Sequence, residues 1–264
     1  MNGFPFTFLL GRPDLCSQIV HNFLLDFCIA LCYNKYDERR KEMKKMFDPT
    51  ERFIVLDTET TNSIDDPICY DVGFAVIDAT GKVYESHSYV VADVFLDKEL
   101  MESAYFKDKV PQYWDEIKQG KRILRRFSTI KAILADVMRQ YEIKIVIAHN
   151  ARFDYRSCNL TLRFLTDSRQ RYFFPYGTEM WDTLKMCRQI LKRNADYDAF
   201  CYENEFLTAR MCKRYTAEIL YRFITQNLDF EESHTGLEDV LIEKELFAYC
   251  VKQNPEINGK LWDD

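Results

Sequence analysis

Short apolar runs and amphipathic stripes alternate along this chain from residue 50 onward. Residues 52–56 form an apolar run that ends at Asp57, which is typical of a buried strand that delivers a polar residue at its end. Residues 68–77 and 82–91 are rich in strand-forming residues and are separated by a turn that contains Gly81, so they predict a hairpin. Together these segments predict three strands in an antiparallel meander.

Helical spacing begins after this meander. The apolar residues of 128–141 recur at i, i+3, i+4 and i+7, which predicts an amphipathic helix with Ser128 as its N-cap. Strands are predicted at residues 144–148 and 179–182, and helices at residues 152–165, 183–191, 215–224 and 239–251. Strands that alternate with helices predict an α/β architecture with a mixed sheet.

Composition limits the class of protein. The chain has 264 residues, of which 47% are hydrophobic and 15% aromatic, so it can bury a large core and is not a disordered protein. Its length fits one large domain. The formal net charge of −6 argues against a protein that coats nucleic acid by bulk electrostatics, but it leaves a local basic groove open.

The cysteines and the N-terminal region bear on location. Nine cysteines without a C-x-x-C pair predict reduced thiols and a cytoplasmic protein. The first 45 residues lack a long uninterrupted apolar stretch, so no transmembrane helix and no membrane partner are predicted.

A run of alternating charge at residues 35–45 indicates a boundary near Phe47. We therefore predict an N-terminal extension at 1–46, helical or partner-binding, followed by one large domain at 47–264. Met43 or Met46 as the natural start remains open.

Acidic residues follow the first strand in a pattern that suits metal chemistry. In an extended chain residues i and i+2 share a face, so Asp57 and Glu59 are expected to point into one site. Carboxylate oxygens at this density suit Mg²⁺ or Mn²⁺ better than Zn²⁺. A single D-x-E string is common on solvated loops, so this pair does not identify a site by itself.

Two later strings carry further acids. The strand at 144–148 runs through His149 and Asn150 into a helix whose first turn holds Asp154. A polar loop at 225–238 carries His234 and leads to Asp239 at the start of the last helix. A carboxylate in a first helical turn is also favoured by the helix dipole, so capping is the alternative interpretation of both aspartates.

The three strings in this order resemble the motifs of the DEDDh family of 3′-to-5′ exonucleases, which includes the epsilon proofreading subunit of bacterial DNA polymerase III, ribonuclease T and oligoribonuclease. The family's D-x-E-T motif matches residues 57–60, and H-N-x-x-F-D matches residues 149–154. H-x-A-x-x-D matches His234 and Asp239, with Gly236 where alanine is usual. Thr235 occupies the position at which the tyrosine subgroup has its tyrosine, which favours the histidine subgroup. The resemblance covers about residues 50–252 and also includes the strand-to-helix string at 182–184.

This resemblance implies a fold and a catalytic set. The implied fold is α/β, an RNase H-like mixed five-stranded sheet flanked by helices, here preceded by the N-terminal helical extension. The implied catalytic residues are Asp57, Glu59, Asp154, His234 and Asp239, and the four carboxylates among them are the metal ligands. By analogy Asp57 bridges two divalent ions, Mg²⁺ or Mn²⁺, that clamp an in-line phosphoryl transfer. Glu59 and Asp239 serve the ion that holds the nucleophile, and Asp154 serves the other. His234 is the general base.

Substrate contacts are less specific in the sequence. Thr60 and Asn150 match residues that contact the 3′-terminal nucleotide in the family. Residues 118–131 contain six basic residues and no acid, beside Tyr113, Trp114 and Phe127, which suits backbone tracking and base stacking on a single strand. A solvated basic face is the equal alternative. Residues 188–213 are either a lid over the site or an added helical element.

The predicted function is a metal-dependent 3′–5′ exonuclease that releases nucleoside monophosphates from single-stranded ends, with DNA favoured and a proofreading or repair role. An exoribonuclease that trims RNA is the first alternative, because the same residues serve both sugars. An inactive nuclease fold that binds a polymerase or nucleic acid is the second. A replication role requires a DNA polymerase subunit as a partner in trans.

Overall fold

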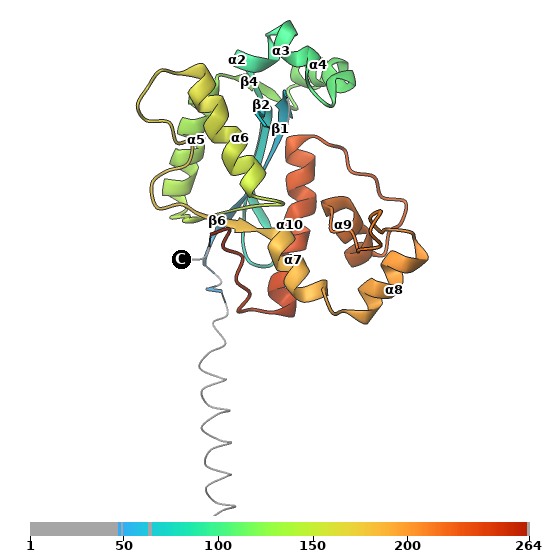
Figure 1. Ribbon diagram of the computed structural model, residues 1–264. Helices are drawn as coiled ribbons and strands as arrows, with labels where there is room; N and C mark the ends of the chain where they lie inside the picture. The colour runs from blue at the N-terminus through green and yellow to red at the C-terminus, as the bar shows by residue number, and fades with distance from the viewer. Residues whose placement is uncertain (1–46, 49, 63–64, 263–264) are drawn as a thin grey trace, which may run out of the picture. The chain divides into compact units, whose positions relative to one another are not determined.

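A six-stranded mixed sheet lies at the centre of the part of the chain that the structure describes, a computed structural model of residues 47–48, 50–62 and 65–262 (Figure 1). The strands are β1 (Phe53–Thr61), β2 (Ile68–Ile77), β3 (Val83–Val91), β4 (Ile123–Arg125), β5 (Ile145–Ala148) and β6 (Glu179–Asp182), in the order β4-β3-β2-β1-β5-β6. Met46–Asp264 is one compact unit. The extension predicted at 1–46 lies outside the described residues.

Strand directions follow the predicted pattern. β1, β2 and β3 form the antiparallel meander, while β5 runs parallel to β1, and β6 runs parallel to β5. The prediction of five strands was one too few, because β4 pairs in parallel with the outer edge of β3. β4 has only three residues, none of them fully buried, so no apolar run in the sequence announces it.

Helices cover both faces of the sheet (Figure 1). One face packs against α5 (Phe127–Gln140) and α6 (Arg152–Leu165). The other packs against α7 (Thr183–Leu191), α8 (Ala195–Glu203), α9 (Ala217–Thr225) and α10 (Gly236–Gln253). The segment between β3 and β4 adds α2 (Ala92–Phe95), α3 (Lys98–Glu102), the 3-10 turn η1 (Lys107–Lys109) and α4 (Val110–Lys118), where we predicted no helix.

Alternation along β1 divides the core into two clusters. Ile54 and Leu56 point to the face of α5 and α6, whereas Phe53 and Val55 point to the face of α10. The strand does not end at Asp57 as expected but continues to Thr61, because β2 pairs with it along its whole length. Asp57 and Glu59 therefore lie within a strand, on the face of α10.

Two local predictions concern the start of α5 and the structure of residues 188–213. α5 begins at Phe127 rather than after Ser128, because the Asp93 carboxylate accepts the Phe127 N–H at 2.7 Å and the helix has no side-chain N-cap. Residues 188–213 comprise the end of α7, α8 and an irregular return, with Tyr197 fully buried against Phe223 of α9. This stretch is therefore an added helical element that packs into the core.

The cysteines and helices of the described residues relate to two sequence predictions, reduced thiols and no transmembrane helix. Cys69, Cys158, Cys187, Cys201, Cys212 and Cys250 are free thiols. Within the described ranges, no helix combines the length and the apolar character that crossing a bilayer requires.

Candidate active site

β1 supplies the first two carboxylates of the candidate site. Asp57 pairs with Gly73 of β2, and Glu59 pairs with Asp71. A Cβ at Gly73 would lie 2.2 Å from the Gly236 carbonyl carbon, so the absence of a side chain allows the first turn of α10 to approach the strand. This close approach brings the beginning of α10 over Asp57 and Glu59.

α6 supplies the third carboxylate. Asp154 lies in the first turn of α6 and is 2% exposed. Its Oδ1 accepts a hydrogen bond of 2.9 Å from the Thr58 hydroxyl, which also lies 3.1 Å from Ser157 Oγ. Because Thr58 stands between Asp57 and Glu59 in the sequence, this bond ties the start of α6 to the strand that carries the first two acids.

The loop before α10 supplies His234, and the first turn of α10 supplies Asp239. Asp239 Oδ2 accepts the Thr235 N–H at 3.0 Å, so this carboxylate also caps the helix, as the alternative interpretation expected. His234 has a φ of 48°, a left-handed conformation that is uncommon for residues other than glycine. Its ring stacks on Phe106 with centroids 4.4 Å apart, and Lys109 donates to the carbonyls of Ser233 and His234.

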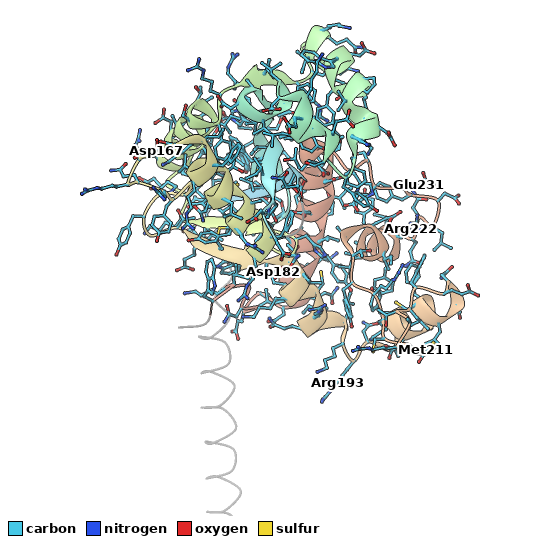
Figure 2. The ribbon with its side chains drawn as sticks, turned by 45° about the horizontal axis from the view of Figure 1, so that its top comes forward. Asp167, Asp182, Arg193, Met211, Arg222 and Glu231 are labelled. Carbon is cyan, nitrogen blue, oxygen red and sulfur yellow. The ribbon has the colours of Figure 1, made fainter. Side chains whose placement is uncertain are left out.

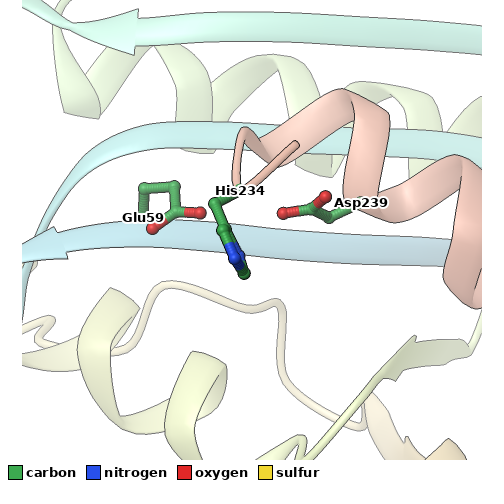
Figure 3. Close-up of side chains that lie close together, drawn as sticks. All are labelled: Glu59, His234 and Asp239. Atoms are coloured by element: carbon green, nitrogen blue, oxygen red, sulfur yellow. The ribbon is translucent and has the colours of Figure 1, made fainter. Parts of the chain in front are cut away.

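Three of the predicted residues converge. One ligand atom each from Glu59, His234 and Asp239 lie within 4.8 Å of one another, and Figure 3 shows these side chains gathered between β1 and the start of α10. Asp57 and Asp154 are outside this trio, but the charges of Asp154, Glu59 and Asp239 all act on Asp57. The structure therefore places all five predicted catalytic residues in one region, from three separate parts of the chain.

Burial and mutual repulsion dominate the electrostatics of this region. Burial raises the pKa of Glu59 to about 9 and the pKa values of Asp154 and Asp239 to about 8. The pKa of Asp57 is also raised, first by burial and then by the charge of Glu243. Burial lowers the pKa of His234, with a smaller contribution from the Lys109 charge. A neutral imidazole therefore stands among carboxylates that repel one another.

The residues present fit divalent cations. The carboxylate oxygens of the grouped side chains suit Mg²⁺ or Mn²⁺. Several carboxylates in one buried region are unfavourable unless protons or cations neutralise them. The donor set and its unfavourable charge thus agree with the cation requirement implied by the sequence.

Thr60 and Asn150, the two predicted substrate contacts, are not among the three grouped side chains. Thr60 is half-buried on β1, next to an irregularity in the pairing with β2. Asn150 is exposed, has a φ of 63°, and donates its backbone N–H to Asp182 Oδ1 at 3.0 Å. Asp182 caps α7 where β6 ends (Figure 2), so the 182–184 string positions the second motif.

His149 has a structural environment. Its Nε2 lies 2.9 Å from the Tyr215 carbonyl, so this nitrogen carries the proton and donates. Its Nδ1 lies 3.0 Å from the Thr183 hydroxyl and can accept. The second motif's histidine therefore holds α7 and the segment before α9 to the end of β5.

The predicted basic and aromatic surface at 113–131 is partly wrong. Arg122 is 2% exposed, and Tyr113 and Phe127 are core residues, so none of these three can track a backbone or stack on a base. Arg122 instead pairs with Asp71 at 3.0 Å, with Glu238 at 2.7 Å and with Glu116. Counting the charges in a short stretch of sequence cannot reveal ion pairs between residues that are far apart in the chain. Trp114, Lys118, Lys121, Arg125 and Arg126 remain exposed.

Sequence reasoning missed three residues of this region. Phe106 and Lys109 contact the His234 loop, but they belong to the unpredicted segment between β3 and β4. Glu243 is buried on α10 near Asp57. A signal for Glu243 was available, because it occupies a position of the buried stripe of α10 that is otherwise mostly apolar.

Comparisons with known proteins identify the fold. No family model and no curated protein matches this chain. A 3′-exonuclease from a structure of 3′-end specific recognition of a histone mRNA stem-loop is 10% identical, with a TM-score of 0.53 over 85% of this chain and 73% of that chain. Exonuclease I from Methylocaldum szegediense is 14% identical, with a TM-score of 0.52 over 78% of this chain and 41% of that chain. An Exonuclease I apo structure is also 14% identical, with a TM-score of 0.52 over 78% and 43%.

These likenesses concern the fold. They confirm the predicted α/β class, since the chain shares the mixed sheet flanked by helices with structures of exonucleases. This chain spans less than half the length of the two Exonuclease I chains.

Proposed function

We propose that this chain is a divalent-cation-dependent 3′–5′ exonuclease of the DEDDh type, in the subgroup that includes the epsilon subunit and ribonuclease T. The observation that supports this most directly is the convergence of Glu59, His234 and Asp239 within 4.8 Å, from motifs that are far apart in the sequence. The exonuclease fold agrees with it. An inactive binding module has no requirement for this convergence.

In this proposal the protein's residues have distinct roles. Asp57, Glu59, Asp154 and Asp239 hold two divalent ions, which when bound stabilise the charge that develops during in-line phosphoryl transfer. The His234 imidazole accepts the proton of the attacking water. Burial keeps the pKa of His234 below its ordinary value, so at neutral pH the ring is uncharged and able to accept this proton.

Phe106 and Lys109 hold this base in place. The stacked Phe106 ring restricts the rotation of the imidazole, and Lys109 fixes the two carbonyls at the left-handed turn. Thr60 and Asn150 are proposed to contact the 3′-terminal nucleotide. The five exposed residues Trp114, Lys118, Lys121, Arg125 and Arg126 are the remaining candidates for contact with a single strand.

Single-stranded DNA is the substrate that we propose first, with nucleoside monophosphates as products and a role in proofreading or repair. The motif set resembles a family that includes a proofreading subunit, and Exonuclease I is among the structures of similar fold. RNA is the second candidate, because a 3′-exonuclease that recognises the 3′ end of an mRNA stem-loop shares the fold. A cytoplasmic location and a polymerase subunit in trans belong to the same proposal.

The test is degradation of matched 5′-labelled single-stranded DNA and RNA by the wild type and by His234→Ala. Reactions contain Mg²⁺, Mn²⁺ or EDTA. We expect a ladder that shortens from the 3′ end, requires the cation and is lost in the variant, and the faster polymer identifies the substrate class. Failure of the wild type to degrade either polymer with either cation would contradict the proposal.

A further inference from the structure

Glu243 is a buried carboxylate that the proposed function does not use. It lies one helical turn beyond Asp239 on α10 and is 3% exposed. The other positions of this buried stripe include Val240, Leu246 and Phe247. A glutamate at such a position is unfavourable unless both oxygens find partners, so its presence requires an explanation.

The Glu243 carboxylate lies close to the backbone N–H of His149, at the end of β5. Oε2 is buried and has no hydrogen-bond partner within residues 47–48, 50–62 and 65–262. One oxygen of this buried carboxylate is therefore left without a donor among those residues.

Strand register places this carboxylate beside Asp57. Val55 of β1 pairs with Ile147 of β5, and Asp57 and His149 each lie two residues beyond that pair. Parallel neighbours are about 4.8 Å apart across a sheet. A side chain close to the His149 N–H is therefore near Asp57, on the face of β1 that α10 covers.

The charges around Glu243 are also carboxylates. Besides burial, the strongest influences that raise its pKa are the charges of Asp154 and Asp239. In turn, Glu243 is the strongest charged influence on Asp57. Oε2 has no donor among the described residues, and the charges that most strongly raise the pKa of Glu243 belong to carboxylates, so this oxygen is suited to bind a cation.

We propose that Glu243 is a fifth carboxylate of the cation site and that its Oε2 is a cation ligand on the side of Asp57 and Asp154. This inference rests on the proposed function, because it assigns a further ligand to the same ions. It predicts tighter cation binding than four carboxylates alone would give.

The test measures Mn²⁺ binding to the full chain by isothermal titration calorimetry, without nucleic acid. Glu243→Gln keeps the shape of the side chain and removes its charge. We expect it to weaken Mn²⁺ binding by at least about tenfold, or to lose one bound ion. Glu245→Gln is the matched control, because Glu245 is on the same helix with a side chain 43% exposed, and it should bind Mn²⁺ as the wild type does.

A second variant covers a failure of the first to fold. Glu243→Leu restores an apolar side chain to the stripe, so it should unfold at a higher temperature than the wild type in EDTA. Its Mn²⁺ affinity should fall as in Glu243→Gln. A folded variant that binds Mn²⁺ as tightly as the wild type overturns the assignment of Glu243 and leaves the proposed function intact. Absence of Mn²⁺ binding by the wild type would overturn both.

Discussion

At the scale of single residues, the candidate site depends on groups whose own environment is unfavourable. His234 holds a left-handed backbone conformation, and the acids near it share a buried region. Conformations and burial that cost free energy persist only where surrounding contacts enforce them, and they are frequent at functional sites. The contacts that enforce them here are the Phe106 ring and the Lys109 ammonium.

Phe106→Leu tests the first of these contacts. Loss of the stacked ring should let the His234 imidazole rotate, so kcat should fall by about 10- to 100-fold with little change in KM. Single-strand degradation kinetics measure both quantities. Tyr176→Leu is the control, because Tyr176 is fully exposed and should retain the wild-type kcat. A kcat for Phe106→Leu equal to that of the control would show that the stacking does not position the base.

The raised pKa values of the acids predict how cations and pH act together. Burial raises the pKa of Asp154 and Asp239 to about 8, above the values of about 4 expected in the unfolded chain. The folded protein thus binds these protons more tightly, so without cations its stability should decrease as pH rises from about 4 to about 8.

Added Mg²⁺ should reverse this loss. At pH 8 fewer protons compete for the carboxylates, so Mg²⁺ should raise the melting temperature of EDTA-treated protein more at pH 8 than at pH 6. Thermal unfolding at both pH values measures the difference. Equal shifts at the two values would contradict a cation site built from these acids.

At the scale of elements, one buried arginine joins three parts of the fold. Arg122, just before β4, pairs with Asp71 of β2, with Glu116 of α4 and with Glu238 in the first turn of α10. Asp71 Oδ2 also accepts the Gly236 N–H at 3.0 Å. This network holds the first turn of α10, and with it Asp239, against the sheet.

Arg122→Met should therefore destabilise the fold. The substitution leaves Asp71 buried and without its cationic partner, which should lower the free energy of unfolding by about 3–5 kcal/mol. Urea unfolding measures the change. Arg125→Met is the matched control, since Arg125 is exposed on β4 and its loss should change stability by no more than about 0.5 kcal/mol. Similar stabilities for the two variants would show that the network contributes little.

Gly236 also has an element-scale role. An alanine, which is usual at this position in the motif that the sequence resembles, would place a Cβ 2.7 Å from the Gly73 nitrogen, so this chain needs glycine where α10 crosses β2. Gly236→Ala should cost about 1–3 kcal/mol and displace the first turn of α10, lowering activity as well. Helix propensity alone predicts the opposite sign, a gain of up to about 1 kcal/mol. Unfolding experiments distinguish the two, and a more stable variant would refute the close-approach argument.

At the scale of the whole molecule, the site belongs to one compact unit, Met46–Asp264. All five proposed catalytic residues, and both clusters of the core, lie within it. The residues before it carry none of the motifs. We therefore propose residues 47–264 as the exonuclease domain and residues 1–46 as an extension that serves an association.

A fragment of residues 46–264 should fold and degrade a single strand with the kcat of the full chain. Thermal unfolding and degradation assays on both proteins measure this. Binding to a polymerase subunit should be lost in the fragment if the extension mediates that association. A fragment that fails to fold would instead assign the extension a role in the core.

The sequence by itself determined the parts that depend on local pattern. The β1–β3 meander, the order of strands and helices, and the three motif strings follow from periodicities and spacings that a short window contains. The short edge strand β4 and the short helices α2 and α3 were missed, because each is too short to show a periodic apolar pattern. α4 was missed although Val110, Tyr113, Trp114 and Ile117 recur at i, i+3, i+4 and i+7, the spacing of an amphipathic helix.

Only the tertiary structure decided which polar residues meet. A count of local charges assigned Arg122 to a surface, whereas its partners are 6, 51 and 116 residues away in the sequence. Glu243 and Phe106 join the region of Asp57 and His234 only after α10 crosses the sheet at Gly73. Electrostatic and packing partners are residues that lie close together in space. The sequence pattern predicts such closeness only for residues of the same helix or strand.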